Sequence, residues 1–280
     1  MTCALVNRII DASVVDGRGN RTAVFLQGCN YRCAYCHNPE TQSICNTCGD
    51  CIASCPEGAL AIKNGQMIYD AKACCGCDRC IAICKHHSSP KAVWMTAEDC
   101  ATRIAQNIPF IRGVTLSGGE CTLYPDFVRE LFEQTARKGL SNLIDSNGSY
   151  AFFEDDSILQ NCEGVMLDVK AWDAETYKRL TSAERPHILR NLAFLYEQGK
   201  LAEIRIVIEP TSVDAQHIVE AIGDAIPLPG RERMLLRLIP YRAYGVAKEW
   251  RQKLRTPSQA DMEQLLAACR RLGWQNCQSA

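Results

Sequence analysis

Two cysteine runs with identical spacing constrain the fold of this 280-residue chain more than any other part of its sequence. Each run has the form C-x2-C-x2-C-x3-C, and every cysteine of the first run recurs 29 residues later in the second. The runs consist of Cys45, Cys48, Cys51 and Cys55, followed by Cys74, Cys77, Cys80 and Cys84. Eight cysteines that obey one spacing rule indicate an internal duplication whose two halves bind metal.

The spacing of these runs resembles that of bacterial ferredoxins, in which the fourth cysteine of each run binds the cluster of the other run. The resemblance implies two 4Fe–4S clusters, one held by Cys45, Cys48, Cys51 and Cys84 and the other by Cys74, Cys77, Cys80 and Cys55. Zinc ribbons are the alternative, although they rarely show three closely spaced cysteines followed by a single one. Only the first run ends in the Cys-Pro pair of the ferredoxins, since the second continues into Lys85.

The segment between the two runs predicts a β-hairpin. Residues 58–63 and 67–69 read as short strands, and Asn64-Gly65 between them favours a tight turn. A hairpin in this place is expected of a small ferredoxin module. We therefore predict a ferredoxin-like insert at residues 45–84, within a discontinuous domain of residues 1–44 and 85–280.

Composition and charge narrow the class of protein. Hydrophobic residues make up 47% and charged residues 22% of the chain, as in a soluble globular protein. The formal net charge of −1 gives no electrostatic reason to expect nucleic acid or an anionic membrane as a partner. The first residues lack the apolar core of a signal peptide, and no apolar run reaches the roughly 20 residues that span a bilayer. We therefore expect a cytoplasmic protein, whose 18 cysteines do not form a disulfide framework.

Outside the predicted insert, short β-branched runs alternate with longer amphipathic stretches, which is typical of parallel βαβ units. Strands are predicted at residues 22–27, 113–117, 142–145, 164–168, 203–208 and 234–239. Helices are predicted at residues 97–106, 126–138, 174–180, 186–198, 215–225 and 258–272. Six strands with covering helices favour an α/β fold that is a partial TIM-like barrel, (β/α)6, rather than the closed eight-stranded form.

A third cysteine motif follows the first of these predicted strands. Cys29, Cys33 and Cys36 have the spacing C-x3-C-x2-C, and the motif contains no fourth cysteine. A closed structural metal site takes four protein ligands, whereas a reactive site keeps one position open. Three thiolates on a 4Fe–4S cubane would leave one iron free to bind a substrate. A zinc knuckle completed by His37 is the alternative.

Further polar motifs are predicted at or near the carboxyl ends of the other strands, the edge at which barrel enzymes carry their chemistry. In chain order they are Ser117-Gly118-Gly119-Glu120, Asp145-Ser146-Asn147-Gly148, Asp168-Val169-Lys170, Arg205 and Pro240-Tyr241-Arg242. Because these motifs and the three cysteines would meet on a single rim, the sequence predicts one active site there.

Together, these motifs resemble those of the radical S-adenosylmethionine (SAM) enzymes, in which the open iron chelates the amino and carboxylate groups of the methionine moiety. The whole chain is most similar to the glycyl radical enzyme-activating branch of that superfamily, and within it to YjjW-type activases with a two-cluster ferredoxin insert. The segment Asp16-Gly17-Arg18-Gly19-Asn20-Arg21 also matches that branch, except that Arg18 replaces the usual proline. The resemblance implies a radical SAM barrel with three 4Fe–4S clusters.

The resemblance also implies roles for individual residues. The SAM-binding residues would be Tyr35, Cys36, His37, Gly118, Gly119, Glu120, Asp168, Val169, Lys170, Arg205 and Arg242. The two glycines would let the backbone approach the methionine moiety, which a Cβ atom would obstruct. A monovalent cation would be bound by Asp145, Ser146, Met166 and Asp168. A plain ion pair between Asp168 and Lys170 is the alternative to that cation.

The reaction that the resemblance implies is reductive cleavage of SAM to a 5′-deoxyadenosyl radical. This radical would abstract a hydrogen atom from a specific glycine of a separate glycyl radical enzyme. The partners would be that enzyme and a low-potential reductant such as flavodoxin or ferredoxin, and the chain is expected to be a monomer. The insert would relay electrons or bind the partner enzyme. Two functions compete: another radical SAM enzyme that modifies a protein or peptide with auxiliary clusters, and a ferredoxin-type electron carrier.

Overall fold

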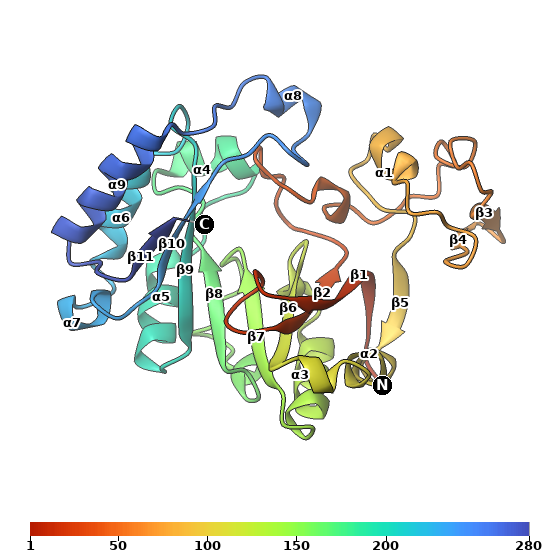
Figure 1. Ribbon diagram of the computed structural model, residues 1–280, viewed down its shortest axis with the longest axis horizontal. Coiled ribbons are helices and arrows are strands. Elements are labelled where there is room, and N and C mark those ends of the chain that lie inside the picture. The colour runs from red at the N-terminus through yellow and green to blue at the C-terminus, as the bar shows by residue number, and fades with distance from the viewer. Residues whose placement is uncertain (280) are drawn as a thin grey trace.

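In the computed structural model, which describes residues 1–279, the chain is built around one mixed β-sheet (Figure 1). Nine strands of the described residues form it, in the order β11-β10-β9-β8-β7-β6-β2-β1-β5. Neighbouring strands from β2 to β11 run parallel, whereas β1 pairs antiparallel with both β2 and β5. The strands are β1 Cys3–Ser13, β2 Arg21–Leu26, β5 Val93–Thr96, β6 Gly113–Gly118, β7 Ser141–Ser146, β8 Gly164–Asp168, β9 Leu201–Ile208, β10 Leu236–Pro240 and β11 Cys277–Ser279.

All six predicted strands are present, and they are the consecutive parallel strands from β2 to β10. The prediction of an α/β fold with a mostly parallel central sheet is therefore confirmed. The sequence analysis missed β1, β5 and β11. The first of these alternates buried and exposed positions irregularly, and the other two are only 4 and 3 residues long.

The parallel strands form the buried centre of the molecule. All six residues of β2 are buried, and Val24, Leu116 and Ile144 on neighbouring strands have no exposed surface. Strands of a parallel sheet are covered on both faces, so their sequences are apolar nearly throughout. This is why these strands could be found as short continuous apolar runs.

The six predicted helices are also present, and they connect and cover the parallel strands (Figure 1). They are α2 Ala97–Ala105, α3 Pro125–Ala136, α4 Ala174–Thr181, α5 Ile188–Glu197, α6 Ala215–Ile222 and α9 Gln259–Arg271. Side-chain caps set several starts: Thr96 accepts a hydrogen bond from Asp99 N, and Ser258 forms a capping box with Asp261. Two short helices, α7 Leu228–Arg231 and α8 Lys248–Arg251, lie in the C-terminal third. None of the helices among residues 1–279 is long and apolar enough to cross a membrane.

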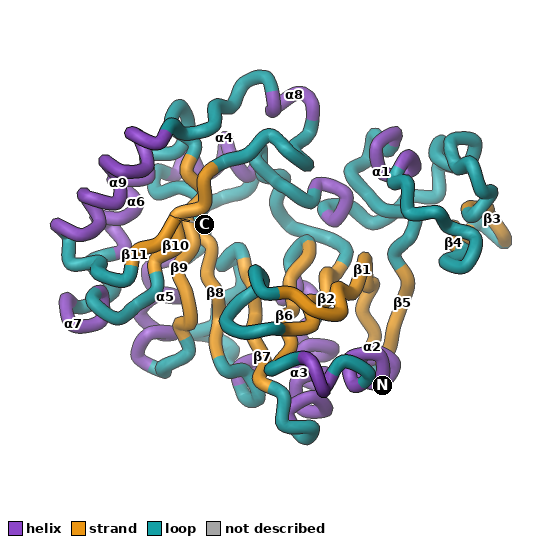
Figure 2. The backbone as a smooth tube through the Cα atoms, in the orientation of Figure 1, coloured by secondary structure: helices purple, strands orange, loops and turns teal. Residues whose placement is uncertain are grey.

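Residues 45–84 contain the predicted hairpin, which is confirmed. Strands β3 Leu60–Lys63 and β4 Gln66–Tyr69 pair antiparallel in a separate two-stranded sheet, and the short helix α1 Arg79–Ile83 follows. The rest of this segment is mostly loop (Figure 2). Its buried hydrophobic cluster consists of Cys51, Leu60 and Cys80 alone and is separate from the main core. A single β-bridge between Ser43 and Ser88 joins the chain just before and just after the segment.

Candidate active site

A cavity of about 220 Å³ lies at the carboxyl ends of the parallel strands, beside the loop that follows β2. Of the predicted site residues, it is lined by Cys29, Cys33, Tyr35, Cys36, His37, Gly118, Gly119, Asp145, Ser146, Asp168, Lys170 and Arg205. Residues that the sequence analysis did not select as ligands also line it: Tyr31, Asn38, Thr41, Gln42, Ser117, Asn147, Val207 and Ile239. The structure thus brings motifs that are far apart in the chain to one cavity.

Backbone hydrogen bonds fix the loop that carries the three cysteines. Gly28 N donates to Thr41 O at 2.8 Å, which ties the start of the loop to a later turn. Arg32 N donates to Thr181 O at 2.7 Å, which ties the loop to the end of α4. Gly28 has a φ of +100°, a backbone conformation that favours glycine. The position of the cysteines is therefore set by the barrel, although they lie outside helices and strands.

The three cysteines of this loop are half-buried in the cavity wall. Burial raises the pKa of Cys29 to about 11 and that of Cys33 to about 12. Burial also raises the pKa of Cys36. In the absence of metal, all three are therefore neutral thiols at pH 7. Binding to iron would reverse this state, because a thiol that coordinates a metal is deprotonated outright.

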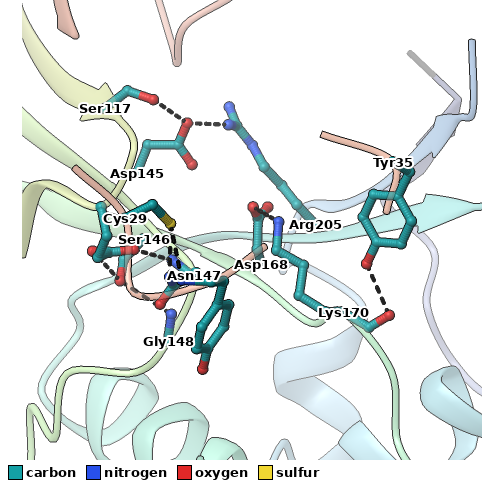
Figure 3. A network of polar contacts seen from close by, with 12 residues as sticks. Cys29, Tyr35, Ser117, Asp145, Ser146, Asn147, Gly148, Asp168, Lys170 and Arg205 are labelled. Carbon is teal, nitrogen blue, oxygen red and sulfur yellow. Dashed lines mark hydrogen bonds and ion pairs between the residues drawn. The ribbon is translucent and has the colours of Figure 1, made fainter. Parts of the chain in front are cut away.

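Two carboxylates at neighbouring strand ends face the cavity, and each has a cationic partner (Figure 3). Arg205 Nη1 lies 3.0 Å from Asp145 Oδ2, and Lys170 Nζ lies 2.5 Å from Asp168 Oδ2. Ser117 Oγ also donates to Asp145 Oδ2 at 2.9 Å. Burial alone would lower the pKa of Lys170, but the charge of Asp168 raises it well above the usual value. Burial raises the pKa of Asp145; the charge of Arg205 opposes this effect and that of Asp168 adds to it. Each carboxylate of the cavity therefore has a cationic partner that offsets its repulsion of the other.

The residues predicted to bind a monovalent cation have other partners. Ser146 Oγ donates to Glu120 Oε1 at 3.0 Å, and the sulfur of Met166 lies 3.1 Å from Arg205 Nη2. The other two, Asp145 and Asp168, take part in the ion pairs just described. The ion pair that was the alternative to the cation is therefore present, and the cation itself stays a prediction.

Glu120 was predicted to contact SAM, but the structure places it beneath the cavity. Its side chain is only 1% exposed and does not line the cavity. It accepts hydrogen bonds from Thr122 Oγ1 at 2.7 Å, Ser146 Oγ at 3.0 Å and Asn147 N at 2.7 Å. Burial raises its pKa. Glu120 is thus a buried connector that fixes the end of β7 relative to the end of β6.

The two glycines line the cavity, and their backbone contacts give a second physical reason for glycine beside the predicted approach of SAM, which stays a prediction. A Cβ atom on Gly119 would lie 2.0 Å from the carbonyl oxygen of Gly28, and one on Gly118 would lie 2.2 Å from Leu26 N. Gly118 also has a φ of +114°. Glycine is therefore required here because the ends of β6 and β2 pack backbone against backbone.

Two other predicted SAM contacts lie outside the cavity lining. Val169 has no exposed surface and packs into the main core, because it points away from the face that Asp168 and Lys170 share. Arg242 does not line the cavity, but its carbonyl oxygen accepts a hydrogen bond from His37 Nε2 at 3.1 Å. This contact joins the loop after β10 to the cysteine loop.

Tyr35 and His37 keep their predicted places in the cavity wall. Tyr35 is 3% exposed, and its hydroxyl donates to Lys170 O at 3.1 Å. Burial lowers the pKa of His37, so the ring is neutral at pH 7. Because the Arg242 carbonyl can only accept, the proton of His37 is on Nε2.

The cysteines of residues 45–84 gather around two further cavities. One is lined by Cys45, Cys48, Cys51 and Cys84, and the other by Cys55, Cys74, Cys75, Cys77 and Cys80. The grouping crosses the two runs in the way that the ferredoxin resemblance implies. Whether these cysteines hold clusters stays a prediction.

None of the described residues forms a group of three or more His, Cys, Asp or Glu side chains arranged around a single metal ion. A cubane differs from such a site, because each of its irons takes one protein thiolate. The thiolates of a cluster therefore surround a volume and do not converge on a point.

The decisive comparison is with protein families. The family model of the Radical SAM superfamily matches residues 23–222. The chain belongs to the radical SAM superfamily. It is 30% identical over 235 residues to the (2S)-3-sulfopropanediol sulfolyase activating enzyme of Bilophila wadsworthia, covering 77% of this chain and 78% of that enzyme. It is 28% identical over 272 residues to the benzylsuccinate synthase activating enzyme of Thauera aromatica. That match covers 89% of this chain and 81% of the activating enzyme.

Among solved structures, the radical SAM chain is similar in fold to QueE from Escherichia coli. The TM-score is 0.57 at 13% sequence identity, and the match covers 99% of this chain and 94% of QueE. At that identity the likeness concerns the fold alone.

The residues present fit the 4Fe–4S cluster and the SAM that membership of this superfamily implies. Cys29, Cys33 and Cys36 line the cavity, and no other cysteine of residues 1–279 does. One iron of a cubane would therefore lack a protein thiolate. The paired charges of Asp145, Arg205, Asp168 and Lys170 give the same cavity polar groups for the charged end of SAM.

Proposed function

We propose that this chain is an activating enzyme that installs a glycyl radical in a partner enzyme. The observation that carries the proposal is the open set of three thiols on the wall of the strand-end cavity. The relatives named above support the reaction class, since both are named as activating enzymes. When bound, the cluster supplies the electron that splits SAM into methionine and a 5′-deoxyadenosyl radical, which takes a hydrogen atom from the Cα of the partner's glycine.

Arg205 would orient the carboxylate of SAM or the backbone of the partner. Its Nε, Nη1 and Nη2 atoms already contact Glu203 at 2.6 Å, Asp145 at 3.0 Å and Met166 at 3.1 Å. A guanidinium carries five N–H groups, so some remain free to donate into the cavity. Because the three existing contacts hold the side chain in place, Arg205 would lose little freedom when it binds a ligand.

Lys170 and Asp168 would bind the ribose or carboxylate of SAM beside Arg205, whose strand β9 pairs with β8 at Asp168. Their ion pair is largely shielded, with side-chain exposures of 13% and 24%. Asp168 can accept hydrogen bonds from ribose hydroxyls while it remains paired with Lys170. The side chains of the cavity would thus position SAM and exclude water.

We also infer that residues 45–84 hold two 4Fe–4S clusters, as in the YjjW-type activases. The grouping of the insert cysteines around two cavities supports this inference. The clusters would accept electrons from a low-potential donor such as flavodoxin or ferredoxin, or help to bind the partner. The protein is expected to act as a monomer, which sedimentation of the reconstituted enzyme would test.

The experiment is to mix the anaerobically reconstituted protein with SAM, a reductant and candidate glycyl radical enzymes. The proposal predicts about twelve irons per chain, formation of 5′-deoxyadenosine, and an EPR doublet from a glycine-centred radical on one partner. Formation of 5′-deoxyadenosine without a radical on any glycyl radical enzyme would favour another radical SAM modifying enzyme. Redox cycling without SAM cleavage would favour an electron carrier.

A further inference from the structure

Two side-chain amides outside the predicted set lie against thiols of the three-cysteine motif. Asn147 Nδ2 lies 3.9 Å from Cys29 Sγ, a contact drawn in Figure 3. Gln42 lines the cavity together with Cys36, and its side chain lowers the pKa of that thiol against the larger, opposite effect of burial. Both amides line the cavity, and each is only 6% exposed. These sulfur atoms stand for the thiolates that would bind iron.

The orientation of the Asn147 amide is determined by its neighbours. Its Oδ1 accepts a hydrogen bond from Ser149 N at 2.9 Å, so the NH2 group must point the other way. That NH2 group donates to Asn30 Oδ1 at 2.9 Å and faces Cys29. The backbone of Asn147 is fixed in turn by Glu120, which accepts from its N–H at 2.7 Å. The buried Glu120 therefore fixes the backbone from which the Asn147 amide reaches the sulfur of Cys29.

Gln42 is fixed from its backbone. Its N–H donates to Pro39 O at 3.1 Å, and its carbonyl oxygen accepts from Cys29 N at 2.9 Å. The residue thus spans the motif, with its backbone on the first cysteine and its side chain on the third.

We propose that Asn147 and Gln42 are positioning residues that set the reduction potential of the cluster held by Cys29, Cys33 and Cys36. An N–H donor draws electron density from a thiolate sulfur and stabilises the more negative, reduced cluster, so it raises the reduction potential. This inference rests on the proposed function, because it requires a cluster on these cysteines.

The test replaces each amide by an apolar side chain of similar size in the full-length protein, as Asn147→Leu, Gln42→Met and the double variant. Thr41→Val is the matched control, because Thr41 lines the same cavity but its hydroxyl donates to the carbonyl oxygen of Asn38 at 2.7 Å. Iron content is measured first. The midpoint potential is then obtained by an EPR redox titration of the signal that changes when SAM is added.

Each single variant is expected to keep its iron and to titrate at a lower potential than the wild type, with the largest shift in the double variant. The control is expected to titrate like the wild type. Potentials equal to that of the control would overturn the inference, and so would loss of the cluster from both single variants, since the amides would then serve assembly. If only one single variant loses iron, the midpoint potential of the other single variant tests the inference. A wild-type protein without a SAM-sensitive cluster would instead refute the proposed function.

Discussion

The strand-end cavity of the parallel sheet (the barrel site) and the cysteine cavities of residues 45–84 (the predicted insert) differ in what holds them in shape. The barrel site lies at the ends of buried strands, on a floor of shielded ion pairs and the connector Glu120. The insert has a hydrophobic cluster of only three buried residues, two of which are the cysteines Cys51 and Cys80. Its Cys48 and Cys77 are exposed. A segment of this size without a real core usually needs metal to fold.

The comparison teaches that two sets of cysteine ligands in one chain can relate to the fold in opposite ways. In the barrel, the fold builds the site and the metal is added to it. In the insert, the metal would supply much of the energy that keeps the segment folded. Four measurements test this difference between the two regions.

The largest effect is expected from the loss of one cysteine in each region. Cys33→Ala should abolish SAM cleavage, because the cluster beside the cavity loses a ligand. Cys77→Ala should leave SAM cleavage by dithionite-reduced enzyme in place and impair only electron delivery from a protein donor. The assay measures the formation of 5′-deoxyadenosine by chromatography. Cys100→Ala is the control variant, because Cys100 is a buried cysteine outside all three motifs. Formation of 5′-deoxyadenosine by reduced Cys33→Ala at the rate of the wild-type enzyme would disprove the site assignment.

Removal of iron should separate the two regions in a second way. Anaerobic chelation is expected to remove the hydrogen-exchange protection of residues 45–84 while the amides of β6, β7 and β8 remain protected. The reason is that the strands keep their core without metal, whereas the insert does not. Mass spectrometry of peptides after exchange measures both regions in one sample. Equal protection of the insert with and without iron would show that its fold is independent of metal.

Ion pairs in the two regions should differ in their effect on stability. Arg205 is 10% exposed, so Arg205→Met leaves the shielded carboxylate of Asp145 without its cationic partner and should cost about 3–5 kcal/mol of unfolding free energy. Asp78 of the insert, whose side chain is 65% exposed, pairs with Lys91, which follows the insert. Lys91→Met should therefore cost about 1 kcal/mol or less. Urea titrations of both variants test this, and similar losses would contradict the difference in burial.

The smallest effect concerns thiol reactivity in iron-free protein. A backbone hydrogen bond from Arg79 lowers the pKa of the exposed Cys77, whereas burial raises that of Cys33 to about 12. Since the thiolate is the nucleophile, Cys33 should react with iodoacetamide at pH 8 roughly tenfold or more slowly than Cys77. Its rate should rise as the pH increases toward 12. Peptide mapping over time measures both rates, and equal rates at pH 8 would argue against the shielding of the barrel thiols.

Much of this architecture could be predicted from the sequence, because its signals are local. The parallel strands are continuous apolar runs, and the cysteine spacings indicated which thiols group together. The strands that were missed, such as β5 and β11, are too short to show a period. Their existence depends on the neighbours with which they pair.

Several site residues have contacts that the local sequence does not reveal. Glu120 follows the glycines directly, yet its side chain turns beneath the cavity because donors from two segments meet it there. The close packing of Gly118 and Gly119 against β2 also depends on tertiary contacts. Asn147 belongs to a motif predicted at the rim, and Gln42 does not, but the sequence identified neither amide as a thiolate donor. An amide becomes such a donor only through its orientation.

The central claim is that three thiols of the barrel hold a cluster with one iron open to SAM. The most direct measurement is the EPR spectrum of the reduced, reconstituted protein before and after addition of SAM. We predict that SAM alters one component of the wild-type spectrum and that this component is missing from Cys33→Ala. A spectrum that SAM leaves unchanged, or zinc in place of iron at these cysteines, would contradict the account.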